Sequence, residues 1–562
     1  MDPKYIWIGV GVVALLIIVY LVLTANFRKK RKFFARILSH YGVTPDREYT
    51  VEELRKIRTY FDLVHEEKDF AIDDITWNDL NMDDIFAVLN HTYSSMGEEE
   101  LYRMLREPAQ DEEILRKRSK LIDYFRSHEQ ERAEVLIEYA GIGRTKKYSL
   151  LEHITKLNDL KLRENIGYLL HLLLLIVAAL STIFNPFIGI MAVLGVIIFN
   201  LFTYYSQKAQ VEAYYTSLSA VAYIVKAAER IEKLNVPALK PYMEELETYV
   251  KPLRVLKSDA RFLGASNAAQ VSANPLYLIL DYLRMATHLD FIAFNHMVKT
   301  VRKEDANIKE VLRILGRIEA LIGIASFRET LPFYCEAEFT DKKVFSLTDS
   351  YHPLIKEPVA NSVHTEKSML VTGSNASGKS TFLRTAAISQ ILAASVCTVP
   401  AHAMKTGFFR VFSSMALQDS VSAGESYYIV EIKSIKRIMD ALREETPVLA
   451  FVDEVLRGTN TVERISASSQ ILKSFGDKNA IVFAATHDVE LTYLLENLYT
   501  NIHFEEEVEG DKVNFSYMLK EGRATTRNAI KLLQVMGYDP AVIEKAEASA
   551  EHFTKEGEWT LF

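Results

Sequence analysis

The sequence predicts a multidomain protein that combines transmembrane helices, an all-helical region and an α/β domain. Three observations predict this architecture. An uncharged apolar run near the N-terminus is long enough to cross a bilayer, and a second apolar block lies further along the chain. From about residue 346, short apolar runs alternate with helical stretches, which is typical of a parallel sheet with helices between its strands. At 562 residues, the chain is long enough for several domains.

The composition limits the classes of function that the protein can have. The formal net charge is -8, so the chain as a whole lacks the basic character of a dedicated nucleic-acid binder. The two cysteines, Cys335 and Cys397, lie far apart, which excludes a disulfide scaffold and a cysteine-based zinc site. Such sparse use of cysteine fits a reducing compartment for the soluble part.

Residues 5–25 form the first predicted transmembrane helix, because about 20 uncharged apolar residues span a bilayer. Basic residues follow at 28–32, so the N-terminus is expected outside and the rest of the chain in the cytoplasm. A cleaved signal peptide is the alternative, but its charge would precede a shorter apolar run. The expected domains are an N-terminal anchor at 1–25 and a basic juxtamembrane region at 26–70.

The second apolar block, residues 166–202, predicts a hairpin of two further spans. Asn185-Pro186 is a turn signal, and it divides the block into runs near the short end of spanning length. Basic residues flank the block, so both of its ends are expected on the cytoplasmic side. A buried helical hairpin in a soluble core is the alternative. The three spans predict a multi-pass protein of a bacterial-type inner membrane, with membrane lipid as a partner.

The rest of residues 71–345 is expected to be helical, because apolar residues recur there with helical spacing. Ser94 and Ser95, followed by Glu98, predict a helix start with a capping box. Residues 301–327 predict one long amphipathic helix.

The α/β domain, expected at 346–527, contains a phosphate-binding loop. The sequence from Gly373 to Ser380 fits G-x-x-x-x-G-K-[ST], between the apolar strand 368–371 and a helix that begins near Lys379. Backbone N–H groups and the helix N-terminus bind phosphate, Lys379 is expected to reach the β- and γ-phosphates, and Ser380 to ligate magnesium. The predicted nucleotide-binding residues of this loop are Gly373, Ser374, Asn375, Ala376, Ser377, Gly378, Lys379, Ser380 and Thr381.

A second apolar strand, 447–454, ends in Asp453 and Glu454. A carboxylate such as Asp453 at this strand end can hold the magnesium ion of a P-loop enzyme. Glu454 is placed to orient or deprotonate the attacking water. An apolar strand that ends in Asp-Glu is by itself an ordinary feature, but its position downstream of the phosphate-binding loop favours the catalytic interpretation.

Two further segments contain candidate residues of the same site. A third apolar strand begins at residue 480 and ends at His487, a candidate sensor of the γ-phosphate, although a lone histidine at a strand end is usually structural. The stretch SVSAGESYYIVEI contains Ser422, Gly424 and Ser426, which can offer hydroxyls and a backbone N–H to a phosphate. A Ser/Gly stretch is more often an ordinary loop.

In this order, the four segments resemble the ATPase domain of the MutS family of DNA mismatch-repair proteins. GSNASGKST (373–381) is similar to the family's GPNMGGKST, and AGESYYIVEI (423–432) to its S-G-R-S-T-F-M-V-E-M segment. DEVLRGTNT (453–461) matches DE-x-G-R-G-T-S-T closely, and AATHDVELT (484–492) matches F-A-T-H-x-x-E-L-T.

The resemblance extends upstream and downstream. VLNHTYSSMGEEELYRMLREP (88–108) resembles the family's helical core domain, and YHPLI (351–355) the segment that introduces its ATPase domain. Residues 517–548 resemble its closing segment and the helices that follow. The chain departs from the family at Ser374 and Ser377, which replace a Pro and a Gly.

The resemblance implies a fold and a set of partners. It implies an all-α MutS-type core/lever domain at 71–345, interrupted by the membrane hairpin, an ABC-type P-loop ATPase domain at 346–527, and C-terminal dimerisation helices at 528–562. In this family two ATPase domains form composite sites across a dimer, so Gly424 and Ser426 would meet the ATP of the partner subunit of a homodimer. The implied cofactors are ATP and Mg²⁺.

The function implied is that of a membrane-anchored, Mg-dependent ATP hydrolase whose cycle closes and reopens a dimeric clamp. Mismatched or branched DNA is the ligand that the family implies. Residues 26–70 are too few for the family's mismatch-reading domain, so a variant without that N-terminal domain is expected. One alternative is an ATP-driven membrane scaffold that acts on a protein partner without DNA. Another is a transporter ATPase, against which the uncharged spans and the lack of an L-S-G-G-Q segment argue.

Overall fold

A computed structural model describes the chain from residue 31 to residue 559. Within this range the residues left undescribed are 67–69, 146–148, 264–281, 375–376, 416–426, 477, 510–511, 525–529, 531–532 and 534–535. The predicted anchor at 1–25 therefore lies outside the described residues, as do Asn375, Ala376, Gly424 and Ser426.

The chain forms two compact units, and the polypeptide passes between them several times. The first unit contains the chain up to Glu66, Asn90–Arg103 and Lys120–Glu329, and the second contains Glu67–Leu89, Met104–Ser119 and the chain from Thr330. The domain boundaries expected from the sequence remain predictions.

The described residues of the first unit are helical, as expected. Besides a helix at 31–40, they form α2 (Val51–Val64), α7 (Glu129–Ile142), α8 (Leu150–Lys156), α9 (Asn165–Phe184), α10 (Pro186–Lys233), α11 (Lys240–Val250), α12 (Leu256–Leu263), α15 (Leu289–Lys303), α16 (Asp305–Arg328) and the 3₁₀ turns η1 (Leu157–Asp159), η2 (Pro237–Leu239) and η3 (Lys251–Val255). Helices α5 (Ser95–Arg106) and α6 (Glu112–Ser127) contribute residues to both units.

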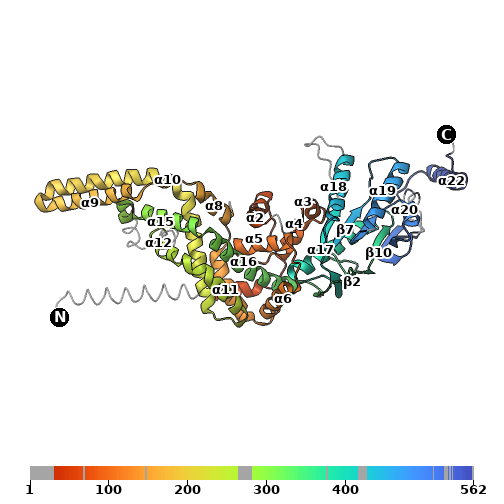
Figure 1. Ribbon diagram of the computed structural model, residues 1–562, viewed down its shortest axis with the longest axis horizontal. Helices are drawn as coiled ribbons and strands as arrows, with labels where there is room; N and C mark the ends of the chain where they lie inside the picture. The colour runs from red at the N-terminus through yellow and green to blue at the C-terminus, as the bar shows by residue number, and fades with distance from the viewer. Residues whose placement is uncertain are drawn as a thin grey trace. The chain divides into compact units, whose positions relative to one another are not determined.

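The apolar block forms the predicted helical hairpin. α9 and α10 lie side by side (Figure 1), and Asn185 between them caps α10 by accepting a hydrogen bond from the backbone N–H of Ile188 at 3.2 Å. Asn165–Phe184 and Pro186–Ala209 are long and apolar enough to cross a membrane, with mean hydropathies of 2.3 and 2.2. Only 11% and 17% of these stretches are buried, which argues against the alternative of a hairpin inside a soluble core.

The single helix predicted at 301–327 is in fact two helices, because the chain is interrupted at Glu304. This residue has φ −106° and ψ 22°, outside helical geometry, between α15 and α16. Its carboxylate accepts a hydrogen bond from Asn307 Nδ2 at 2.6 Å, a local side-chain contact that stabilises the interruption. Apolar spacing cannot reveal this break, since apolar residues recur with helical period on both sides of it.

The helix predicted near Ser95 begins there, but the predicted capping box is wrong. Ser94 accepts a hydrogen bond from the backbone N–H of Gly97 at 3.2 Å. Glu98 does not reach back to the helix start; instead its buried carboxylate pairs with Lys56 at 3.2 Å. A buried carboxylate gains more from a cationic partner than from a neutral N–H, and this explains the outcome.

The second unit contains two sheets. The larger has the order β10-β9-β4-β8-β7-β6, with β10 antiparallel to β9 and the other five strands parallel, and the smaller has the order β1-β5-β2-β3. The strands are β1 (Ala337–Thr340), β2 (Phe345–Ser350), β3 (Asn361–Thr365), β4 (Ser368–Thr372), β5 (Ala403–Gly407), β6 (Arg410–Ser414), β7 (Val448–Asp453), β8 (Ala480–Ala485), β9 (Tyr499–Glu509) and β10 (Lys512–Glu521). The helices are α3 (Asp74–Asp79), α4 (Met82–Leu89), α17 (Lys379–Val396), α18 (Tyr427–Ala441), α19 (Thr461–Gly476), α20 (Val489–Leu494) and α22 (Pro540–Glu556).

The three apolar strands expected from the sequence are β4, β7 and β8. They lie next to one another in the larger sheet, in the order β4-β8-β7. One face of this sheet packs on α18, α19 and α20 through a shared apolar core. On the other face, Phe483 of β8 contacts Phe345 of β2 and Phe382 of α17, with ring centroids 5.5 and 6.2 Å apart. The sheet is thus covered on both sides, as its continuous apolar strands require.

Candidate active site

The phosphate-binding loop connects the end of β4 to the start of α17, as the sequence predicts. Gly373 and Gly378 have φ values of 145° and 107°, which side chains disfavour. A Cβ on Gly373 would lie 2.8 Å from the carbonyl oxygen of Phe504, so only glycine fits there. The Lys379 ammonium donates to the carbonyl oxygens of Gly373 at 2.8 Å and Ser374 at 2.7 Å. These two carbonyl groups therefore hold the lysine ammonium beside the first part of the loop.

The carboxyl end of β7 brings Asp453 to this loop. Asp453 is in register with Ala485 of β8, and β8 is in turn paired with β4, so the three strand ends share one edge of the sheet. The Ser380 hydroxyl at the start of α17 donates to Asp453 Oδ2 at 2.5 Å. The two residues predicted to hold magnesium are therefore neighbours.

Glu454 follows on a strained turn, with φ 60°, where its backbone N–H still donates to the carbonyl of Ala485 at 2.9 Å. One carboxylate oxygen lies 3.0 Å from His487 Nε2, and the other accepts a hydrogen bond from Arg457 Nε. Burial raises the pKa of Glu454, but the hydrogen bonds from His487 and Arg457 outweigh it and lower the pKa to about 2. Glu454 is therefore an anion at neutral pH, and two predicted catalytic residues are in contact.

A cavity of about 550 Å³ opens at this edge of the sheet. Its lining includes the predicted site residues Lys379, Ser380, Asp453, Glu454 and His487. Its remaining lining includes an apolar group made of Ile355, Pro358, Val359 and Tyr517. The cavity thus combines a polar, charged part with an apolar part.

Four further residues near the cavity had no role in the sequence prediction. They are His352, Arg457, Glu506 and Tyr517. Two of them lie in segments that resemble the MutS family, Arg457 in DEVLRGTNT and His352 in YHPLI. This resemblance is the signal in the sequence that could have identified them. Nothing in the sequence pattern singles out Glu506, because it stands in a run of three glutamates. The structure shows that its carboxylate accepts a hydrogen bond from Ser374 Oγ at 2.7 Å.

Tyr517 is positioned by a distortion of β10. Its φ is 54°, and the pairing of β10 with β9 shifts register between Phe515 and Leu519. Asn361 fixes this shape, because its amide donates to the Tyr517 carbonyl at 2.9 Å and accepts from the Leu519 N–H at 2.7 Å. The tyrosine ring consequently lies close to Gly378 of the phosphate-binding loop.

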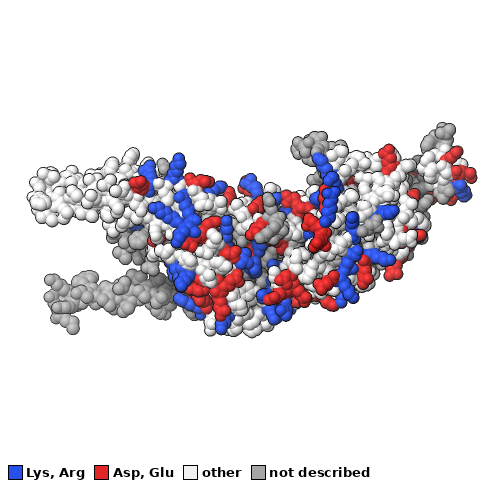
Figure 2. Space-filling view, in the orientation of Figure 1, with Lys and Arg blue, Asp and Glu red and all other residues white. Residues whose placement is uncertain are grey.

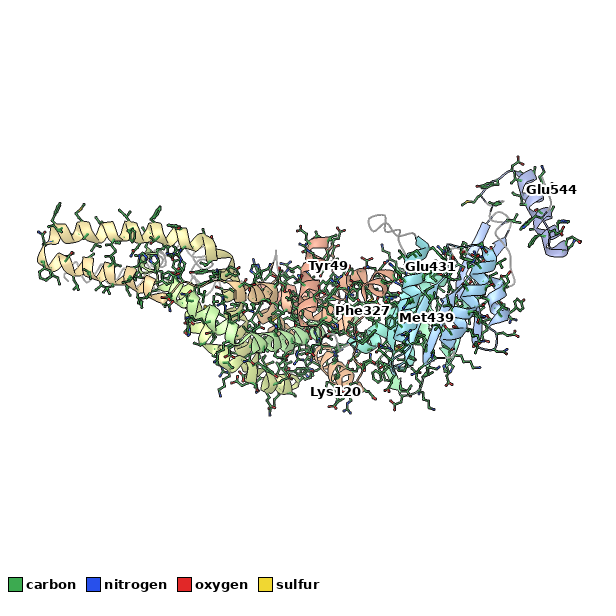
Figure 3. The ribbon with its side chains drawn as sticks, turned by 45° about the horizontal axis from the view of Figure 1, so that its top comes forward. Tyr49, Lys120, Phe327, Glu431, Met439 and Glu544 are labelled. Atoms are coloured by element: carbon green, nitrogen blue, oxygen red, sulfur yellow. The ribbon has the colours of Figure 1, made fainter. Side chains whose placement is uncertain are left out.

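The turn after β7 is also tied to α18. Glu431, labelled on α18 in Figure 3, accepts a hydrogen bond from the backbone N–H of Arg457 at 3.1 Å. Burial raises the pKa of Glu431, and the backbone N–H groups of the turn oppose that shift. α18 begins at Tyr427, directly after the undescribed residues 416–426 that contain Gly424 and Ser426.

Comparison with protein families agrees with this geometry. Residues 369–554 match the family model described as MutS domain V, which is the ATPase domain of that family. The match begins in β4 and ends in α22, so it includes the phosphate-binding loop, the carboxylates at the end of β7 and His487. This part of the chain, residues 369–554, is therefore similar to the ATPase domain of the MutS family.

Proposed function

We propose that the protein is a membrane-anchored ATPase that binds and hydrolyses ATP with magnesium and uses the cycle to move a dimeric clamp. One observation carries the proposal. Three separate segments of the chain line one cavity and contribute to it Lys379, Ser380, Asp453, Glu454 and His487. Such convergence of a phosphate-binding loop with two carboxylates is what phosphoryl transfer requires.

The cavity suggests how a nucleotide would lie. Burial lowers the pKa of Lys379, while Asp453, Glu454 and Glu506 oppose that shift. Phosphate oxygens would replace the loop carbonyls as partners of the Lys379 ammonium. The base would occupy the apolar part of the cavity, where Tyr517 offers a ring for stacking.

Ser380 and Asp453 would hold the magnesium ion, since hydroxyl and carboxylate oxygens are ligands that it prefers. No group of three or more His, Cys, Asp or Glu side chains that could hold a metal ion occurs among the described residues. This fits magnesium, which is usually bound by one or two protein groups together with phosphates and water. The ion would neutralise charge on the β- and γ-phosphates.

Glu454 would take the proton of the attacking water. A carboxylate whose pKa is about 2 is a weak base, and the bonds from His487 and Arg457 are what make it weak. Hydrolysis would therefore begin when Arg457 exchanges the Glu454 carboxylate for a phosphate oxygen. His487 would stay beside the carboxylate and contact the γ-phosphate.

The clamp would be a homodimer in which Gly424 and Ser426 contact the nucleotide of the partner subunit. Similarity to the MutS family supports DNA, mismatched or branched, as the ligand of the clamp and a role related to mismatch repair. The net charge of -8 gives no independent support for DNA. An ATP-driven scaffold that acts on a protein partner is therefore kept as the second candidate.

The hairpin supports attachment to a membrane. Figure 2 shows the surface of α9 and the neighbouring part of α10 as white, with Lys and Arg side chains gathered next to it. An exposed apolar hairpin is costly in water and stable in lipid. Basic residues beside a span remain on the cytoplasmic side, which would place the ATPase domain in the cytoplasm.

The decisive experiment measures ATP hydrolysis by the detergent-purified chain, alone and with homoduplex, mismatched and branched DNA. Glu454→Gln is the test variant, and Glu445→Gln, an exposed acid of the same unit, is the control. We expect Glu454→Gln to bind ATP but to lose activity by about 100-fold or more, which is typical for a catalytic base. Glu445→Gln should be unchanged.

Each outcome has a clear meaning. Normal turnover by Glu454→Gln would remove Glu454 from its role. A rate that changes with DNA, and less so at high salt, would support the DNA clamp. A rate that depends on Glu454 but is indifferent to every DNA would support the scaffold instead.

A further inference from the structure

A second cavity lies in the first unit, remote in sequence from the nucleotide site. It measures about 730 Å³ and is formed by the helix at 31–40, α7 and α10. Lys32, Phe33 and Arg36 line it from the first of these helices, and Tyr223 and Arg230 from α10. The remaining lining, from α7, is Ile137, Glu138, Ala140 and Gly141.

The lining carries an excess of positive charge. Among the described residues that line it, Glu138 is the one acid, and its carboxylate is already bonded to Arg230 Nε at 2.5 Å. Lys32 and Arg36 are exposed, and no ion pair joins either to another described residue. They stand four residues apart on one helix, where like charges repel each other. Among the described residues, these two cations therefore have no ion-pair partner.

Arg230 is fixed in place and only partly satisfied. Its guanidinium lies 5.0 Å from the centre of the Tyr223 ring and is held by Glu138. Its Nη2 atom is buried and has no hydrogen-bond partner among the described residues. Gly141 permits this arrangement, since a Cβ there would lie 2.7 Å from the Tyr223 hydroxyl. A buried donor without a partner is costly unless a ligand or water supplies an acceptor.

We propose that this cavity binds a phosphate group, carried by an anionic phospholipid headgroup or by a soluble phosphate compound. Guanidinium and ammonium groups are the side chains that bind phosphate best, and Arg36, Arg230 and Lys32 bring them to one cavity. A volume of about 730 Å³ holds more than a bare phosphate, so the ligand has an organic part that packs on Phe33, Ile137 and Tyr223.

The position of the cavity gives the ligand access to the membrane helices. Lys32 closes the basic run that follows the predicted anchor, and basic residues next to a span attract anionic lipids. Tyr223 and Arg230 belong to α10, one continuous helix that starts at the hairpin turn. Occupancy of the cavity would therefore stabilise the cytoplasmic end of the same helix whose other end is expected in the bilayer.

The test measures ligand binding to the full chain purified in a neutral detergent. The probes are phosphatidylglycerol, phosphatidylcholine, glycerol phosphate and inorganic phosphate. Binding is followed by the shift of the thermal unfolding midpoint and, for lipids, by native mass spectrometry. The test variant is Lys32→Gln with Arg36→Gln, because both residues are exposed and neither forms an ion pair with any part of the chain that the structure describes.

The matched control is Lys240→Gln with Lys251→Gln, which changes the net charge equally at exposed positions of the same unit outside the cavity. We expect phosphatidylglycerol to bind and phosphatidylcholine to bind less, with affinity reduced roughly tenfold in the test variant and unchanged in the control. If glycerol phosphate or inorganic phosphate competes, a soluble compound is a sufficient ligand; if neither does, the ligand is the lipid headgroup. Equal loss in both variants, or no binding of any phosphate probe, would overturn the proposal.

Discussion

Three polar groups of the nucleotide cavity are bonded to the protein itself. Lys379 is held by loop carbonyls, Glu454 by His487 and Arg457, and Ser374 by Glu506. A nucleotide has to displace some of these contacts. If the site works as proposed, the strength of each contact influences how tightly ATP binds and how fast it is cleaved, and each contact can be changed separately.

Arg457→Gln should move the pH dependence of hydrolysis. Burial raises the pKa of Glu454, and Arg457 is one of the two partners that lower it, so without Arg457 the pKa rises. Activity needs the carboxylate, so the loss of activity on acidification should begin at a higher pH than in the wild type. Arg443→Gln, an exposed change of equal charge, should leave the profile in place. An unmoved acid limb in Arg457→Gln would show that Glu454 does not control it.

Glu506→Gln should tighten ATP binding. The Glu506 carboxylate is buried, and it lies beside the loop that is proposed to receive the phosphates. Glutamine can still accept the hydrogen bond from Ser374, so the loop geometry is kept while the charge is removed. We expect Kd for ATP to fall by about tenfold, because a charge near a partly buried site contributes about 1 kcal/mol or more. The control is Glu521→Gln, at an exposed residue of β10. An unchanged Kd for ATP in Glu506→Gln would show that the Glu506 carboxylate does not repel the bound phosphates.

At the scale of elements, the short helix α3 connects to the edge strand β6. Asp79 at the end of α3 accepts hydrogen bonds from Ser413 Oγ at 2.7 Å and from the backbone N–H of Met415 at 2.9 Å. Thr76 of the same helix accepts one from the backbone N–H of Ser413 at 3.0 Å. Met415 directly precedes residues 416–426, so α3 holds the point from which the Gly424 and Ser426 segment departs.

Asp79→Ala should therefore have two effects. It leaves the Ser413 hydroxyl and the Met415 N–H without their buried acceptor, which costs about 1–3 kcal/mol of the free energy of unfolding. It should also lower kcat more than it weakens ATP binding, because Met415, which precedes the predicted Gly424 and Ser426 contacts, loses the acceptor of its backbone N–H while the phosphate-binding loop is untouched. Asp79→Asn, which retains one acceptor, should recover part of both losses. Asp84→Ala, at an exposed site on α4, is the control; equal losses there would mean that the effect is nonspecific.

The whole molecule combines an ATPase unit with a helical unit that carries the apolar hairpin. Phe184 lies at the turn of the hairpin and is 90% exposed. If the hairpin crosses a membrane, this turn lies on the side opposite the ATPase. The native thiols, Cys335 and Cys397, are half-buried and buried in the ATPase unit.

Phe184→Cys should accordingly react with a membrane-impermeant maleimide added to intact cells. Glu212→Cys, an exposed site on α10 beyond the span, should react only after lysis. The unaltered chain measures the background from the native thiols. Equal labelling of both variants in intact cells would contradict the proposed topology.

The parts of the fold that depend on local sequence were predicted well. Strands β4, β7 and β8, the start of α17 and the break of the hairpin at Asn185 follow from apolar runs, glycines and a turn signal. The two wrong predictions, the capping box at Glu98 and the unbroken helix through Glu304, have the same cause. In both cases a side chain has a partner, Lys56 or Asn307, that periodicity does not register.

The sequence by itself predicted a phosphate-binding loop, two carboxylates and a histidine at the ends of apolar strands. The structure places these residues around one cavity, and their chemical roles stay predictions. Only the tertiary structure decided their surroundings. Tyr517 lines the cavity and Glu506 contacts Ser374 because β9 and β10 extend the sheet beside β4, more than a hundred residues later in the chain. The phosphate cavity of the first unit likewise exists only where the helix at 31–40 meets α7 and α10. Contacts between distant segments depend on packing, and no local pattern encodes them.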